Sequence, residues 1–152
     1  MISSGSSLRT ALVLPLPPST NHLYHPIIIS RQSGAPHYSL ALTPEARAWK
    51  EQATLLARQW ALHNHWTLVS HDWVIIWFRL IWPDHRARDI PNLKALWDAL
   101  EHVIYHNDAQ ALPRPFIPTY DKQHPRIVLT FYRMGELPEP EGLWLGSGDV
   151  YE

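Results

Sequence analysis

The stretch from Trp73 to Trp82 constrains the fold most strongly. Apart from Arg79 it is apolar, and β-branched and aromatic side chains occupy both of its alternating sets of positions. This pattern is typical of a strand buried inside a sheet. Pro83 follows directly, and the run is far shorter than the roughly 20 apolar residues that a membrane-spanning helix needs. We therefore predict a central core strand and no membrane segment.

The composition indicates one globular domain. The chain has 152 residues, of which 45% are hydrophobic and 18% are charged, and a domain of about 150 residues buries one sizeable core. The absence of cysteine excludes a disulfide framework, a thiolate zinc site and a cysteine nucleophile. The apolar segment after Arg9 is broken by prolines, so it does not resemble a secretory signal, and we expect a cytoplasmic location.

The distribution of charge separates a mildly basic body from an acidic C-terminal tail. After Gly135 there are five acidic residues and no lysine or arginine. Without these five, the 13 basic residues outnumber the remaining nine acidic residues by four. We expect a mildly basic domain over residues 8–135, an acidic tail over 136–152 that is rich in proline and glycine, and disorder in this tail and in residues 1–7.

The first half of the chain contains the pattern of one strand and one helix. Thr10 to Leu14 is typical of a short strand that the following prolines end, and Ser19 to Leu42 is expected to be a long connection. Thr43 and Pro44 form a helix start, with threonine as the N-cap and proline at the first helical position. The apolar residues that then fall on one helix face are Ala46, Trp49, Ala53, Leu56 and Trp60.

The second half predicts a helix between two strands. After the core strand comes a polar loop from Asp84 to Ile90, and Pro91 opens a helix whose apolar positions extend to Ile104. Residues 112–120 contain three prolines and can form an edge strand at most, whereas residues 126–133 form a last strand. The predicted order is β-α-β-α-β. It gives an α/β (α+β) fold in which a small mixed β-sheet packs against two main helices.

Two acidic residues flank the predicted second helix and suggest a metal site. Asp89 lies in the loop before the helix, and Asp108 lies in the loop after it. Mg²⁺ prefers hard oxygen ligands and often uses only one or two protein carboxylates together with substrate phosphates. Arg86, Arg88 and Lys94 nearby would suit a phosphodiester, and the chemistry indicated is metal-assisted hydrolysis. The pattern alone also fits a solvated surface loop in which Asp89 caps the helix.

Three motifs, in order, resemble the RusA-type Holliday junction resolvases, a family of small bacterial and phage endonucleases. The first is Leu16-Pro17-Pro18-Ser19-Thr20-Asn21, and the second runs from Leu42 to Trp49. The third runs from Pro83 to Gln110, where the family has Pro-Asp, several arginines, Asp-x-Asp-Asn-x-x-Lys, Asp-Ala-Leu and a closing Asp-Asp-Ser/Ala-Gln. The resemblance covers residues from about 12 to 135.

The resemblance implies a homodimer that binds four-way DNA junctions and makes paired Mg²⁺-dependent nicks in recombination and repair. Asp89 matches the first motif aspartate, Lys94 the motif lysine, and Asp108 the second residue of the closing pair. On this basis Asp89 and Asp108 are expected to hold the metal, and Lys94 to stabilise charge on the phosphate. Arg86 and Arg88, and Asn21 of the first motif, are expected to contact DNA.

Two acidic residues of the family pattern are absent. Pro91 stands at the second motif aspartate, Asn107 replaces the first acid of the closing pair, and one residue is missing between Asn92 and Lys94. If the helix begins after this gap, the Lys94 side chain keeps its direction on the helix. If the gap lay inside the helix, it would rotate Lys94 by about 100° around the helix axis. Three hypotheses remain: an active resolvase, a catalytically impaired module that binds branched DNA without cutting it, and an unrelated α/β domain.

Overall fold

The computed structural model describes residues 9–19, 24–32, 35–88 and 93–137. Its strands are β1 (Leu12–Pro15), β2 (Tyr24–Gln32), β3 (Ala35–Leu42), β4 (Val74–Trp82), β5 (Ala111–Pro115), β6 (Thr119–Tyr120) and β7 (Arg126–Arg133). Its helices are α1 (Pro44–His63), α2 (Lys94–Leu100) and the short 3₁₀ helix η2 (Asp108–Gln110). The mixed sheet and two main helices confirm the predicted fold class.

The Trp73–Trp82 run forms the centre of the main sheet, as predicted, from Val74 onward. The strand order is β1-β7-β4-β5, and β6 also pairs with β4. The pairs β1–β7 and β7–β4 are antiparallel, whereas β5 and β6 run parallel to β4. The proline-rich segment therefore does form an edge strand, β5. Trp73 itself is 49% exposed, so its assignment to the core was wrong.

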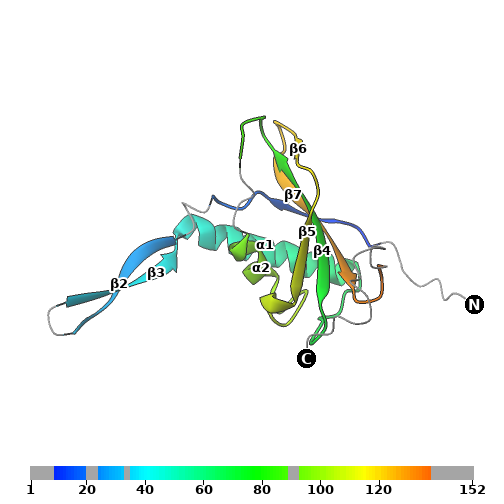
Figure 1. The fold of residues 1–152 in the computed structure, drawn as a ribbon. Helices are drawn as coiled ribbons and strands as arrows, with labels where there is room; N and C mark the ends of the chain where they lie inside the picture. The colour runs from blue at the N-terminus through cyan, green and yellow to red at the C-terminus, as the bar shows by residue number, and fades with distance from the viewer. Residues whose placement is uncertain (1–8, 20–23, 33–34, 89–92, 138–152) are drawn as a thin grey trace, which may run out of the picture.

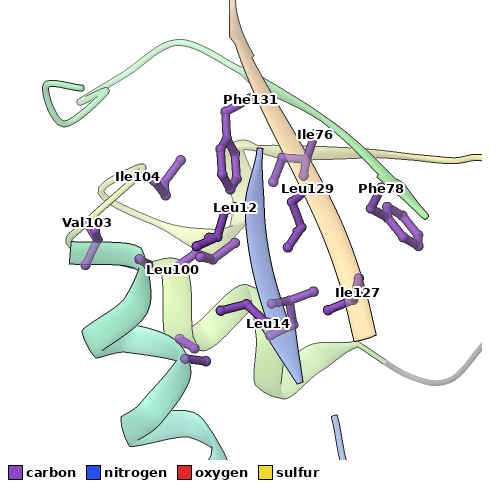
Figure 2. Close-up of a cluster of buried hydrophobic side chains, with 14 of the residues drawn as sticks. Leu12, Leu14, Ile76, Phe78, Leu100, Val103, Ile104, Ile127, Leu129 and Phe131 are labelled. Carbon is purple, nitrogen blue, oxygen red and sulfur yellow. The ribbon is translucent and has the colours of Figure 1, made fainter. Parts of the chain in front are cut away.

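The core lies between the two helices and one face of this sheet. Alternate residues of β4 and β7 point into it, and Leu12 and Leu14 enter from β1 (Figure 2). Helix α1 begins as predicted, because the Thr43 side chain accepts a hydrogen bond from the Ala46 backbone N–H at 3.2 Å. The indole N–H groups of Trp49 and Trp60 then donate to the carbonyl oxygens of Pro15 and Thr10 and fix α1 to the N-terminal segment.

The expected connection from Ser19 to Leu42 was wrong: most of it forms the antiparallel hairpin β2–β3. This hairpin projects from α1 and lies apart from the main sheet (Figure 1). Pro26 and Pro36 lie within these strands, but a two-stranded ribbon has two edges, so a missing backbone donor is tolerated there. Because residues typical of loops occur in this segment, its two edge strands were not predicted from the sequence.

The second helix is shorter than its apolar spacing predicts. The chain leaves the helix at Glu101, and His102 has a φ of +62°, which breaks the helical path. Ile104 still reaches the core, but from the following turn, where its N–H donates to the Leu100 carbonyl at 2.9 Å. Apolar spacing predicted the burial of Ile104 correctly and its secondary structure wrongly. Pro91, the predicted first residue of this helix, lies outside the described residues.

The end of the domain includes one residue that was assigned to the acidic tail. Glu136 forms an ion pair with Arg9 and accepts a hydrogen bond from the Arg133 backbone N–H at 3.0 Å. Burial raises the pKa of Glu136, but these hydrogen bonds outweigh burial and leave the pKa below its usual value. The first residue of the expected tail is therefore bound to the folded domain by these contacts. Residues 1–7 and 138–152, for which disorder was expected, lie outside the described residues.

Candidate active site

Three carboxylates converge where α2 ends and η2 begins. Asp98 lies in the last turn of α2, Glu101 directly follows the helix, and Asp108 is the first residue of η2. One oxygen from each lies within 4.8 Å of the others, and all three residues are half-buried. Asp108 was a predicted site residue, whereas Asp98 and Glu101 were not among the predicted site residues.

Lys94 joins this acidic cluster from the first turn of α2. Its ammonium lies 2.7 Å from Asp98 Oδ1 and 2.7 Å from Asp108 Oδ2. The contact with Asp98 follows from i,i+4 spacing on one helix, while the contact with Asp108 crosses from α2 to η2. Since α2 begins at Lys94, the one-residue gap in the family motif falls before the helix, and Lys94 faces Asp108.

The ion pair between Lys94 and Asp108 shifts the pKa values of these two groups toward their charged forms. Hydrogen bonds to Asp108 and Asp98 raise the pKa of Lys94 above its usual value. The hydrogen bond from Lys94 lowers the pKa of Asp108. Near neutral pH the site therefore holds the Lys94 ammonium beside the ionised Asp108 carboxylate, and it can accept a cation or a phosphate only by rearranging these contacts.

Asn107 and Gln110 fix the backbone that presents Asp108. The Asn107 side chain accepts from the Ala109 N–H at 2.8 Å, and Gln110 Oε1 accepts from the Asn107 N–H at 2.9 Å, so the two form a capping box. The Gln110 amide also donates to the carbonyl oxygens of Val69 and Asp72. At the position where the family pattern has an acid, Asn107 thus helps to orient Asp108.

Glu101 acts on Asp108 from the other side. Its Oε1 accepts a hydrogen bond from the Asp108 backbone N–H at 2.9 Å. The turn that brings these two residues together is anchored by Tyr105, whose fully buried side chain donates from its hydroxyl to the Trp97 carbonyl at 2.7 Å. Burial raises the pKa of Tyr105, which keeps this hydroxyl protonated as a donor. Glu101 therefore contributes both a carboxylate and a positioning contact.

The predicted DNA-contacting arginines lie in the loop after β4. Arg88 Nη1 is 2.7 Å from Asp84 Oδ1, and the Arg88 guanidinium lies over the Trp82 ring at 5.0 Å. The hydrogen bond from Arg88 lowers the pKa of Asp84. The Arg86 side chain is exposed and its Nε lies 3.8 Å from Asp84 Oδ2, while its backbone N–H donates to Asp84 Oδ1 at 3.0 Å. Asp84 is thus committed to the arginine loop and is not part of the acidic cluster.

Two predicted site residues, Asp89 and Asn21, lie outside the described residues. Of the remaining ones, the structure brings Lys94 and Asp108 into direct contact and places Arg86 and Arg88 in one loop. The signal that could have identified the two missed acids is helical spacing: residues 94, 98 and 101 share one stripe of a helix. This stripe points to a site only together with Asp108, which the turn after α2 brings next to it.

The donor set fits a hard divalent cation. Mg²⁺ takes oxygen ligands at about 2.0–2.1 Å, so opposite ligands of an octahedron are about 4.2 Å apart. The three carboxylate oxygens lie within 4.8 Å of one another, a span that small side-chain rotations can close. Asp98, Glu101 and Asp108 are therefore the described residues that would hold such an ion, and Lys94 is the cation that occupies their negative field in this structure.

The carboxylates and the lysine gathered at the end of α2 are the kinds of groups that metal-assisted phosphodiester hydrolysis uses. Residues 24–132 match the family model of endodeoxyribonuclease RusA, and the chain belongs to this family. RusA nucleases act on branched DNA as Holliday junction resolvases and are generally metal dependent. No curated protein matches the chain. None of the described helices is long and apolar enough to cross a membrane.

Proposed function

We propose that this protein is a Mg²⁺-dependent endonuclease that resolves four-way DNA junctions in recombination and repair. The observation that carries the proposal is the convergence of Lys94, Asp98, Glu101 and Asp108 at one point in a RusA-family domain. The family pattern lacks two of its acids in this chain. Asp98 and Glu101 provide carboxylates beside Asp108, so the depleted motif still belongs to a three-carboxylate site.

Each residue of the site has a distinct role in the proposed mechanism. Asp98, Glu101 and Asp108, with Asp89 as a further proposed ligand, would hold Mg²⁺, which would supply Lewis-acid activation of water and of the phosphate. Glu101 also fixes the backbone of Asp108. Lys94 places positive charge beside the phosphate on which negative charge accumulates during attack.

The arginines of the β4 loop complete the proposed site. Arg86 and Arg88 hold neighbouring phosphates, and Asn21 contacts the same strand. The Asp84 carboxylate and the Trp82 ring restrain Arg88, so its guanidinium loses less conformational freedom when it meets DNA.

A cleavage assay tests the proposal directly. A labelled four-way junction and a linear duplex of the same arm sequence are incubated with the protein across a Mg²⁺ titration and with a chelator. We expect paired nicks in the junction, only with Mg²⁺, and little cleavage of the duplex. Tight junction binding without nicks at any Mg²⁺ concentration would instead identify a module that binds branched DNA without cutting it.

The proposed functional unit is a homodimer, since a four-way junction offers two symmetry-related strands and each chain contributes one site. The sheet face opposite the core supports this: among the described residues no helix covers it. Val13 lies directly opposite Val128 there, and Trp77 stacks on Phe116 with ring centroids 4.8 Å apart. Val13 is 49% exposed. We propose that a second copy covers this face.

Sedimentation at micromolar concentration checks the dimer. We expect a dimer for the wild type and a monomer for Val13→Lys, because a buried, unpaired charge at a dimer interface is costly. Leu62→Lys is the matched control: Leu62 is 79% exposed on α1, outside the proposed interface, and its replacement should leave the dimer intact. A wild-type monomer that cuts junctions at full rate would contradict the proposal.

A further inference from the structure

Helix α1 carries a row of basic side chains that the proposed mechanism does not use. Arg47, Lys50 and Arg58 lie at helical positions i, i+3 and i+11, which share one face. They line an open groove together with Leu42, Glu51, Thr54 and Leu55. Within the ranges that the structure describes, none of the three cations forms an ion pair. The α1 groove, defined by these seven residues, thus has one acid and three cations.

The α1 groove adjoins the acidic cluster across the contact between the two helices. Thr54 lies one helical turn from both Lys50 and Arg58, and its hydroxyl donates to the Ala99 carbonyl at 3.0 Å. Ala99 directly follows Asp98 in α2. The row of cations on α1 therefore lies beside α2, the helix that carries Lys94 and Asp98, so a nucleic acid at the acidic cluster can extend onto the row.

The length and charge of the groove suit a duplex. At a rise of 1.5 Å per residue, Arg47 and Arg58 are about 16 Å apart along the helix axis. This length corresponds to about five base pairs at 3.4 Å each, and the phosphates of a duplex carry the opposite charge. Leu42 and Leu55 give the groove apolar walls, against which the aliphatic stems of Lys50 and Arg58 can lie.

We propose that the α1 groove binds the sugar-phosphate backbone of one duplex arm of the branched DNA substrate. This inference rests on the proposed function and assigns part of the DNA surface to residues outside the motifs that gave the resemblance. Phosphate contacts position DNA without reading its sequence, and an unbranched duplex offers them as well. The groove therefore adds affinity for any duplex arm and leaves the choice between junction and duplex to the rest of the surface.

A matched pair of double variants tests this role in binding experiments without divalent metal. Lys50→Gln combined with Arg58→Gln removes two positive charges from the groove. Gln52→Glu combined with Gln59→Glu changes the net charge by the same amount on the same helix, at exposed positions outside the groove. Glutamine and glutamate form helices about as well as lysine and arginine, so both variants should keep the fold, which circular dichroism checks.

Fluorescence anisotropy with a four-way junction and with a linear duplex gives the readout. We expect the groove variant to bind both DNAs about tenfold or more weakly, with an unchanged ratio between them, since charged hydrogen bonds to phosphate are lost. The slope of log affinity against log salt should fall by about 2, at about 0.9 per phosphate contact. The control variant should keep the wild-type slope.

The outcomes separate this inference from the proposed function. If the groove variant kept the salt slope and the affinity of the wild type, the inference would be wrong, but the proposed junction nuclease would stand. Equal losses in the groove and control variants would also overturn it, because net charge alone would then explain them. A wild type that binds neither junction nor duplex would overturn both proposals. Should the double variant unfold, Arg58→Gln alone is compared with Gln59→Glu, with an expected slope change of about 1.

Discussion

Replacing Asp108 with asparagine is expected to reduce Mg²⁺-dependent nicking by about a thousandfold or more. The substitution keeps the shape of the side chain but removes the negative charge that lies between Lys94 and Glu101 in the cluster. A metal ligand of this kind contributes several kcal/mol to the stabilisation of charge in the transition state, and about 4 kcal/mol corresponds to a thousandfold in rate. The capping box of Asn107 and Gln110 does not involve the Asp108 carboxylate, so the loop should survive.

Junction binding by Asp108→Asn should stay the same or become tighter, because a negative charge facing the DNA phosphates is lost. The measurement is single-turnover nicking of a labelled four-way junction beside anisotropy without metal. Asp121→Asn is the matched control, since Asp121 also pairs with a basic side chain, Arg126 at 2.9 Å, but lies outside the cluster. Nicking by Asp108→Asn at the wild-type rate would remove Asp108 from the site.

The fold class was predictable because apolar patterning dominates it. The Trp73–Trp82 run predicted the central strand, and threonine and proline at positions 43 and 44 predicted the start of α1. Both signals are local, since an apolar run and a helix cap are each formed by residues that are adjacent in the sequence. The hairpin β2–β3 was missed for the opposite reason: its prolines are tolerated only because both of its strands are edges, which is a property of the pairing.

The candidate site was predictable only in part because the contacts of Asp108 with Lys94 and Glu101 depend on one backbone turn. Motif matching pointed to Lys94 and Asp108, and the structure places their charged atoms 2.7 Å apart. The recruitment of Glu101 depends on the departure from the helix at His102, a residue with positive φ that no apolar pattern signals. The helical prediction continued to Ile104, so it placed Glu101 on the surface of a longer helix and away from Asp108.

Lys94→Ala should separate metal binding from chemistry. The Lys94 ammonium contacts Asp98 and Asp108 at 2.7 Å each, so it competes with any divalent cation for these oxygens. Its pKa is raised above its usual value of about 10.5, and it stays protonated throughout the neutral range, so a change of pH near 7 cannot remove the competition. Removing the ammonium by mutation leaves three uncompensated carboxylates, which repel each other and bind a cation more tightly.

We therefore expect Lys94→Ala to saturate at a lower Mg²⁺ concentration than the wild type and yet to nick junctions about a hundredfold more slowly at saturation, since the charge beside the reacting phosphate is lost. Thermal unfolding gives a readout without DNA: Mg²⁺ should raise the melting temperature of the variant more than that of the wild type. Lys94→Arg keeps the charge and should lie nearer the wild type in both measurements. If Lys94→Ala needed more Mg²⁺ than the wild type, the ammonium would not be a competitor for the metal, and its pairing with Asp98 and Asp108 would instead hold the carboxylates in place for the ion.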